Sequence, residues 1–380
     1  MKDIFYAPVD QSSVDHVPAL RSLLEKMFCT WAAGERVGIK VHWGERGNRS
    51  FLSPAYVREI VQWQLDRGAK PYIFDTTVLY SGGRRTAAES LKTARDNGYE
   101  EKYLGCEIIV ADGSDGRSVT DIPAHGNHFA TAQVADVFRE TDAFIIFSHF
   151  KGHMAASFGG AIKNLSMGFA SRAQKQRMHA DVHPELIRSS CIKCGLCSEV
   201  CPTGAARQDS EEYPEFDLEM CIGCAQCIGL CPEVALRIFW ETDDRVFQEK
   251  LVETAAAVWK MIAGKTILIN ACIRITAECD CWPGHNPVIA PDYGFIGGYH
   301  PLSVDEASLE KVGKAPFEKT HPHVNWERQF TTPVRSVCNS VSKSKRYLRR
   351  HRQSAPRRMK NTPASPLPCR LDFIFDLETE

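Results

Sequence analysis

The chain has 380 residues, and 46 Lys and Arg against 47 Asp and Glu give it a formal net charge of −1. That length allows two or three domains. A composition of 43% hydrophobic and 24% charged residues is ordinary for a soluble globular protein and excludes a fully disordered chain. Residues 1–20 contain no apolar run as long as a signal peptide or a membrane span requires, so we expect a cytoplasmic protein without a membrane span. In that compartment fifteen cysteines, an odd number, favour metal ligands over disulfides.

Strands alternate with helices along the chain up to residue 150, and the same pattern returns after residue 240. Short apolar runs typical of buried strands occur at 37–42, 70–76, 106–112, 143–150 and 265–273. Helical patterns occupy 53–68, 86–99, 134–142 and 246–264, the first of them opening on Ser53 and Pro54. The alternation predicts an α/β fold with a mostly parallel sheet.

The segment at 186–240 interrupts this pattern. We therefore predict one α/β domain in two pieces, 1–185 and 241–330, with a small α+β module of the ferredoxin type inserted at 186–240. Residues 331–380 carry 11 Lys and Arg against 4 Asp and Glu and are rich in Ser, Pro and Arg. Such a composition predicts a disordered basic tail, with an arm for nucleic acid or an anionic surface as the alternative.

Two cysteine runs dominate the inserted segment: CIKCGLCSEVCP at 191–202 and CIGCAQCIGLCP at 221–232. Each has the spacing C-x2-C-x2-C-x3-C-P, in which the fourth cysteine ligates the other cluster of a two-cluster ferredoxin. Two zinc knuckles would instead show separated pairs or histidines. The spacing predicts two 4Fe–4S clusters, one on Cys191, Cys194, Cys197 and Cys231, the other on Cys221, Cys224, Cys227 and Cys201.

The segment resembles bacterial-type ferredoxins over about fifty-five residues, which implies transfer of single electrons, with a stabilising or sensing role as the alternative. Residues 186–240 hold 4 basic and 8 acidic side chains. An acidic surface of this kind suits a basic redox partner protein.

Polar residues follow the predicted strands, at the edge where parallel sheets bind ligands. The predicted substrate-binding residues are His42, Asp75 and Arg84, and the predicted catalytic residues are His153, Lys163 and Asp280. In this hypothesis His153 or Asp280 moves protons, while Arg84 and Lys163 hold an anionic group. The stretch SGGRR at 81–85, ahead of a helix, is a second candidate for anion binding.

Two thiols flank the last of these residues, in Cys279-Asp280-Cys281. They could be a redox pair, the edge of a metal site, or inert thiols, and the sequence leaves these three readings open. The chain contains no P-loop and no dinucleotide-binding fingerprint.

Four stretches resemble the DUF 362 family: KVHWGE at 40–45, FDTTVLYSGGRRTAAESLKTARDNGY at 74–99, SHFKGHMAASFGGAIKNLSMG at 148–168, and ECDCW at 278–282 with PDYGFIGGYHPLSVDEAS after it. The resemblance covers roughly 35–329 and implies an α/β protein of a kind that often carries ferredoxin modules. The positions that match the family pattern are Asp75, Tyr80, Gly82, Arg84, His153, Gly160, Lys163, Asn164, Gly168, Cys279, Asp280, Cys281, Pro291, Asp292, Pro301 and Asp305.

Two functions follow from these patterns. In the first, the protein is a ferredoxin-dependent oxidoreductase, whose clusters pass electrons to a small-molecule site in the α/β domain. In the second, it is a relay or binding module that passes electrons to a partner protein and has no catalysis of its own.

Overall fold

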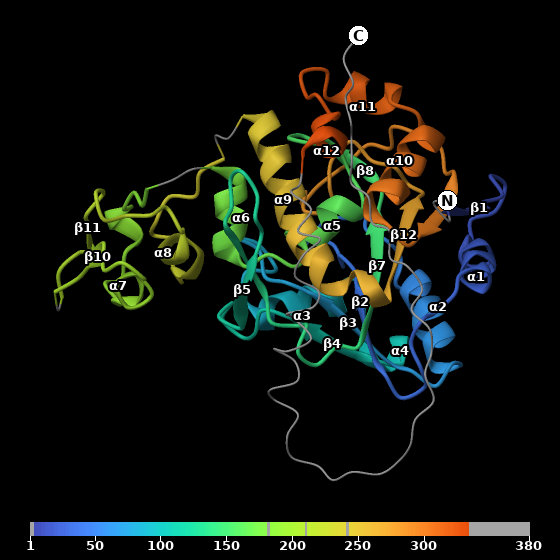
Figure 1. Cartoon of the computed structure of the whole chain (residues 1–380), viewed down its shortest axis with the longest axis horizontal. Coiled ribbons are helices and arrows are strands. Elements are labelled where there is room, and N and C mark those ends of the chain that lie inside the picture. The colour runs from blue at the N-terminus through green and yellow to red at the C-terminus, as the bar shows by residue number, and fades with distance from the viewer. Residues whose placement is uncertain (1–3, 181–182, 210, 241–242, 334–380) are drawn as a thin grey trace, which may run out of the picture. The chain divides into compact units, whose positions relative to one another are not determined.

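The computed structural model describes residues 4–180, 183–209, 211–240 and 243–333, and those up to Thr332 belong to one compact unit (Figure 1). Within these residues a seven-stranded sheet has the order β1-β13-β12-β7-β2-β3-β4. Its strands are β1 (Ile4–Pro8), β2 (Arg36–Lys40), β3 (Lys70–Asp75), β4 (Glu107–Val110), β7 (Ala143–His149), β12 (Thr266–Cys272) and β13 (Gly294–Gly298). The pairs from β12 through β7, β2 and β3 to β4 are parallel, while β13 is antiparallel to both β12 and β1. The predicted mostly parallel α/β sheet is confirmed.

The central strands are buried on both faces, which explains why their sequences are continuous apolar runs. Every residue of β7 and of β12 is buried. In β7, Ile145 and Phe147 join the large core on one face of the sheet, whereas Phe144 turns to the other face and packs its ring on Phe74 and Phe169. This alternation is the period of two that a strand imposes on its side chains.

Helices cover both faces of the sheet (Figure 1). The long ones are α1 (Val17–Lys26), α2 (Pro54–Leu65), α3 (Ala87–Asp96), α9 (Asp244–Ile262) and α10 (Pro301–Val312); shorter ones are α4 (Glu101–Leu104), α5 (Ala161–Met167), α6 (Arg172–His179), α11 (Ala315–Thr320) and α12 (Arg328–Thr331), with 3-10 turns η1 (Arg188–Ser190) and η2 (Ala263–Lys265). Helices α1 and α2 contact each other and the sheet, and α5 contacts both α9 and α10. The predicted starts hold: the Ser53 hydroxyl accepts a hydrogen bond from the Ala55 N–H, and Thr86 forms a capping box with Glu89.

The helix predicted at 134–142 is wrong. Residues Thr131–Ala135 form strand β6, which pairs antiparallel with β5 (Val119–Pro123). Ala132 and Val134 are both buried, two residues apart, as expected for one face of a strand. The cross-strand partners, about eight to sixteen residues upstream, decide the conformation here. A second small hairpin, β8 (Lys151–His153) with β9 (Ser157–Gly159), follows β7 directly.

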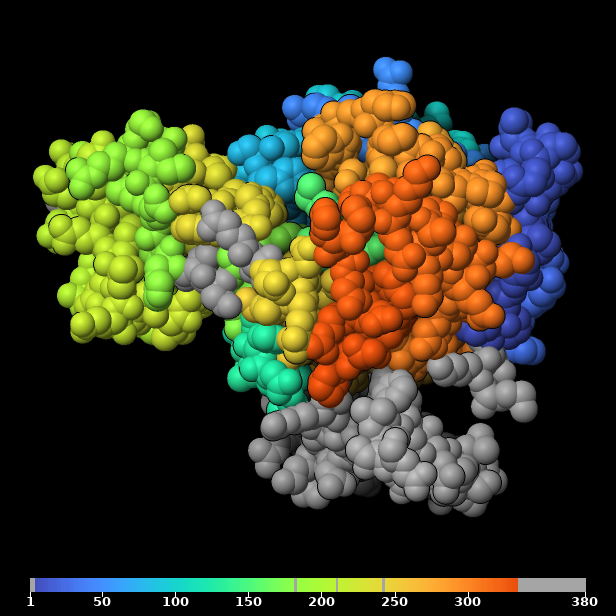
Figure 2. Space-filling model, turned by 90° about the horizontal axis from the view of Figure 1, so that it is seen from above, coloured from blue at the N-terminus to red at the C-terminus, as the bar shows by residue number. Residues whose placement is uncertain are grey.

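The described part of the cysteine segment contains two short helices and one two-stranded sheet. Its elements are α7 (Leu196–Glu199), α8 (Gln226–Leu230), β10 (Ala206–Arg207) and β11 (Glu215–Phe216). Each helix begins five residues after the first cysteine of its run, so the repeat in sequence is also a repeat in structure. In Figure 2 the yellow-green atoms of this segment gather in one lobe. The predicted basic tail lies outside the described residues from 334 onward.

Across the described ranges, no helix has the length and apolar character needed to cross a bilayer.

Candidate functional site

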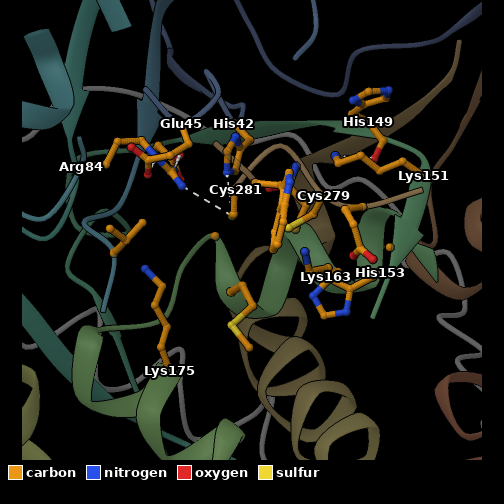
Figure 3. A pocket seen from close by; sticks show the side chains of 18 of the residues that line it. His42, Glu45, Arg84, His149, Lys151, His153, Lys163, Lys175, Cys279 and Cys281 are labelled. Carbon is orange, nitrogen blue, oxygen red and sulfur yellow. Dashed lines mark hydrogen bonds and ion pairs between the residues drawn. The ribbon is translucent and has the colours of Figure 1, made fainter. Parts of the chain in front are cut away.

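A cavity of about 790 Å³ lies at the carboxyl ends of β2, β3 and β7, where the sequence predicted a site (Figure 3). Its walls come from the strand ends, the 78–84 loop, the β8–β9 hairpin, α5 and the loop at 278–283. Five of the six predicted site residues line it: His42, Asp75, Arg84, His153 and Lys163. The sixth, Asp280, does not, although the cysteines on either side of it do.

Asp75 and Arg84 bind each other instead of projecting freely into the cavity. Arg84 Nη1 lies 3.2 Å from Asp75 Oδ2, and Lys40 Nζ lies 2.9 Å from Asp75 Oδ1. Burial alone would raise the pKa of Asp75, but the neighbouring cations, Lys40 first among them, lower it. The carboxylate is therefore charged and fully paired, so its geometry supports the cavity wall and does not fit the predicted direct contact with substrate.

The SGGRR loop does bind an anion, but the anion is a side chain of the protein itself. The Glu45 carboxylate accepts hydrogen bonds from the Gly83 N–H at 2.6 Å, the Arg46 N–H at 2.8 Å and the Tyr80 hydroxyl at 3.1 Å, and Arg84 Nε lies 3.2 Å away. A Cβ at Gly83 would come within 2.8 Å of that carboxylate, which is why glycine is required there. The loop is thus closed to an external anion.

The Cys281 thiol has two donors aimed at its sulfur (Figure 3). His42 Nε2 lies 3.2 Å from Sγ and Arg84 Nη2 lies 3.5 Å from it. His42 Nδ1 accepts the Gly44 N–H at 3.0 Å, so the neutral ring carries its hydrogen on Nε2 and donates it to the sulfur. These donors stabilise a thiolate.

Cys279 is the third donor to that sulfur. A hydrogen bond joins the two thiols; it raises the pKa of Cys279 and lowers the pKa of Cys281 well below its usual value. The pair therefore holds one proton, on Cys279, and one negative charge, on Cys281. Both side chains are half-buried and line the cavity.

Lys163 and His153 lie side by side next to the thiol pair (Figure 3). Burial would lower the pKa of Lys163, but Cys279 and Cys281 outweigh it and the pKa is raised, so the ammonium stays charged. Burial, followed by Lys163, lowers the pKa of His153 well below its usual value. His153 Nδ1 accepts the Ala155 N–H at 3.2 Å, which leaves Nε2 as a donor; this geometry makes His153 a hydrogen-bond donor and a poor base.

Asp280 does not line the cavity and is held by two buried partners that do. Its Oδ2 lies 3.0 Å from His149 Nδ1 and 2.9 Å from Lys151 Nζ. Burial would raise the pKa of Asp280, yet His149 and Lys151 lower it far enough to keep the carboxylate ionised. A permanently charged, enclosed carboxylate does not move protons, so the geometry argues against the predicted role and makes Asp280 the anchor of the loop that carries both cysteines.

The sequence reasoning missed several residues that line the cavity: Lys40, Glu45, Lys175 and Trp240. One signal was present, because a lysine at the end of an otherwise apolar strand, as in VGIK, indicates a buried partner. For Lys175 no signal existed, since α6 reads as an ordinary polar helix. Burial lowers the pKa of Lys175 to about 8 and that of His179 to about 3.

The eight cysteines of the two runs fall into two separate groups. One small cavity is lined by Cys191, Cys194, Cys197 and Cys231, and another by Cys201, Cys221, Cys224 and Cys227. In both groups the last cysteine of one run thus lies among the first three of the other. These are the sets that the spacing predicted.

The donor chemistry of these groups fits iron–sulfur clusters. None of the thirteen cysteines in the described ranges forms a disulfide. Backbone N–H groups point at the sulfurs: Ala206 to Cys201 Sγ at 3.3 Å, and Ala235 to Cys231 Sγ at 3.2 Å. Among the described residues no group of His, Cys, Asp or Glu has the geometry to hold a single metal ion. Four thiols around a small cavity suit a multi-iron cube, which separates its ligands more widely than one ion does.

The cysteine segment meets the cavity wall at two points. Arg85, next to Arg84, donates a hydrogen bond to the Cys231 carbonyl oxygen. Trp240, at the end of the segment, lines the cavity and packs edge-on against His179, with ring centroids 4.6 Å apart. Arg84, which lines the cavity, and Arg85, which contacts Cys231, are consecutive residues. They therefore link the cavity to the cysteine group that contains Cys231.

Fold and site together define an α/β protein with a cationic, thiol-bearing cavity at the carboxyl edge of a mostly parallel sheet. Residues 37–310 match the family described as Domain of unknown function (DUF362). The match covers more than half of the sequence, so the chain belongs to this family, as the resemblance predicted. No curated protein matches the chain.

Two solved structures are similar to this chain at low sequence identity. The lactate racemase apoprotein from Thermoanaerobacterium thermosaccharolyticum is similar at 15% identity and a TM-score of 0.36, over 69% of this chain and 50% of that one. A protein from Thermotoga maritima is similar at 12% identity and a TM-score of 0.40, over 80% of this chain and 60% of that one. The chain thus spans about half of the racemase and 60% of the second protein.

Proposed function

We propose that this protein binds two 4Fe–4S clusters and transfers single electrons to a small-molecule site in its α/β domain. The observation that carries the proposal is the grouping of the eight cysteines into two sets of four, each completed by a cysteine from the opposite run. When bound, each cluster stores and releases one electron.

The protein's own residues would tune and protect the clusters. The N–H groups of Ala206 and Ala235 donate to ligand sulfurs, and such hydrogen bonds set the reduction potential. Ile228 and Leu236 form a small buried core beside the cysteines, which would keep water from the inner faces of the clusters. The outer faces are open, because Ile192 and Ile222 are more than 60% exposed, and a redox partner protein could approach there.

The cavity favours the enzyme over the simple relay. A relay needs no ligand-sized space, whereas this cavity has the volume of a small-molecule site and several perturbed side chains converge on it. Two contacts with the cysteine segment, Arg85 to Cys231 and Trp240 to His179, support a path for electrons between the proposed clusters and the cavity. The protein is therefore proposed to be an oxidoreductase.

Anaerobic purification with iron and sulfide analysis tests the clusters. We expect about eight iron and about eight sulfide per chain, and low-temperature EPR of the dithionite-reduced protein should show two interacting centres. Colourless protein, or protein that holds only zinc, would refute the proposal.

Serine variants test the exchange of ligands between the two runs. Cys231→Ser should leave the same remaining EPR signal as Cys191→Ser, and Cys201→Ser the same as Cys221→Ser. Cys106→Ser, at a half-buried thiol outside both runs, is the matched control and should keep the full iron content. If Cys231→Ser instead resembles Cys221→Ser, each run binds its own cluster and the assignment is wrong.

A further inference from the structure

The thiols of Cys279 and Cys281 stand apart from the eight cysteines of the two runs, and the proposed function gives them no role. They line the cavity, whereas Cys272, on β12, is buried away from it. The Trp282 N–H donates to the Cys279 carbonyl oxygen at 2.9 Å, which closes a turn over 279–282. In such a turn the Cα atoms of the first and fourth residues lie within about 7 Å of each other. The Cα atoms of its first and third residues, Cys279 and Cys281, then lie within the distance of about 4.4–6.8 Å that a disulfide spans.

The two sulfurs are chemically unequal in a way that suits thiol–disulfide exchange. Cys281 accepts hydrogen bonds from His42 Nε2 and Arg84 Nη2 and from the Cys279 thiol. One sulfur is thus an activated nucleophile, and the other is a protonated thiol in contact with it. Lys163, which also contacts Cys279, can help Cys279 lose its proton after the first attack.

The charge of the cavity indicates the kind of substrate. Six Lys and Arg side chains line it in the described ranges against three Asp and Glu: Lys40, Arg46, Arg84, Lys151, Lys163 and Lys175 against Glu45, Asp75 and Glu278. Even with a thiolate on Cys281, and with the Asp280 carboxylate that pairs with Lys151 counted as well, an excess of positive charge remains. An anionic molecule is therefore favoured over a neutral one of the same shape.

We propose that Cys279 and Cys281 form a dithiol–disulfide couple that reduces a small anionic disulfide. The inference rests on the proposed function for the return of electrons, and it deepens that function by naming the substrate class. The number of electrons agrees, because a disulfide takes two electrons and the two proposed clusters release one each.

Reduction of the substrate disulfide proceeds in three steps. The Cys281 thiolate attacks one sulfur of the substrate, the substrate S–S bond breaks, and the first substrate thiolate leaves and takes a proton from solvent. Cys279 loses its proton and attacks Cys281 Sγ; the mixed disulfide breaks, and the second substrate half leaves with that proton. The Cys279–Cys281 disulfide then takes up two electrons and one proton, which restores one thiol and one thiolate. The electrons come from an external one-electron donor through the cluster sites.

Mass spectrometry of the anaerobic holoprotein tests the couple directly. Trypsin releases residues 275–311 as one peptide whose only cysteines are Cys279 and Cys281. After treatment with oxidised glutathione, an anionic disulfide, we expect this peptide to lose the mass of two hydrogen atoms. Cys279→Ser should trap glutathione on Cys281, and Cys281→Ser should trap none, while Cys106→Ser behaves as wild type.

A neutral probe tests the substrate class. Bis(2-hydroxyethyl) disulfide has the same reactive bond without charge. Cys279→Ser should trap it about fivefold more slowly than it traps oxidised glutathione, the upper size of the factor that one charge contact supplies. Equal rates for the two probes would overturn the anionic specificity.

Iron, sulfide and the EPR of the reduced centres are measured in the same samples. These measurements separate the two proposals. If the protein has its full iron content but the thiols of Cys279 and Cys281 do not react, only the dithiol–disulfide couple is refuted. If Cys281 exchanges with the probe in protein that lacks iron, only the cluster proposal is refuted. In protein with full iron, oxidised glutathione should also reoxidise the reduced centres, with two electrons per disulfide, and Cys281→Ser should abolish this. Reoxidation at the same rate in Cys281→Ser would refute the couple.

Discussion

His42 should control the reactivity of Cys281, and the substitution His42→Phe tests this. Phenylalanine retains a planar ring of similar size but lacks the Nε2–H that lies 3.2 Å from the Cys281 sulfur. Arg84 and Cys279 remain as donors. The substitution therefore removes one of three hydrogen bonds to a thiolate.

The size of the effect follows from the strength of that bond. A hydrogen bond to a charged group contributes about 1.5–3 kcal/mol. Because one pKa unit corresponds to about 1.4 kcal/mol, the pKa of Cys281 should rise by about one to two units. The direction is upward because the lost donor stabilised the charged form alone.

The assay is the rate of alkylation of Cys281 by iodoacetamide as a function of pH, read from the 275–311 peptide. Fragmentation of the peptide separates Cys281 from Cys279. His42→Gln, whose side-chain amide can donate, should recover part of the shift, and His125→Phe, at an exposed histidine, should show none. A midpoint in His42→Phe equal to that of wild type would show that His42 does not stabilise the thiolate.

Three further predictions concern stability under anaerobic conditions. Asp280→Asn should lower the free energy of unfolding by about 3–5 kcal/mol in urea, because it leaves the buried Lys151 ammonium without its carboxylate and the buried His149 ring without its acceptor. Asp121→Asn at an exposed site should change it by less than about 0.5 kcal/mol. Equal effects would refute the anchoring role. Burial lowers the pKa of Lys175 to about 8 in the folded protein, against about 10.5 in the unfolded chain. As the pH falls from about 10.5 to 8, the unfolded chain therefore takes up this proton first. The free energy of unfolding falls over that window by about 3 kcal/mol. Lys175→Met should lack this part of the pH dependence, and identical slopes in the two proteins would contradict the shift. Asp305→Asn should cost about 1–3 kcal/mol in the same urea titration, because an amide cannot accept both backbone N–H groups at the start of α5, and an unchanged midpoint would count against that cap.

Much of the fold was readable from local patterns. The buried strands of the sheet are continuous apolar runs, and α2 and α3 begin at residues whose side chains cap helices. The two strands with antiparallel pairing, β1 at the edge of the sheet and β13 beside it, were missed, since Gly294–Gly298 contains three glycines and has no strand signature of its own. The helix predicted at 134–142 was wrong because residues 134 and 135 end strand β6, which exists through pairing with β5.

The candidate site divides in the same way. The spacing of the cysteines alone predicted the two groups of four that line the small cavities, because cysteines held in short loops have few geometric options. Polar residues after strand ends were also correctly placed at one edge, because parallel strands bring their carboxyl ends together. Both predictions depend on features within a few residues of each other.

Only the tertiary structure decided which of these polar groups face each other. His42 contacts Cys281 across 239 positions, Glu45 binds inside the SGGRR loop, and Asp280 pairs with His149 and Lys151. A sequence pattern reports the periodicity and burial of its own segment. The partner of a charged or thiol side chain depends on how distant segments pack, and the fold must place the two within hydrogen-bonding distance before either can act.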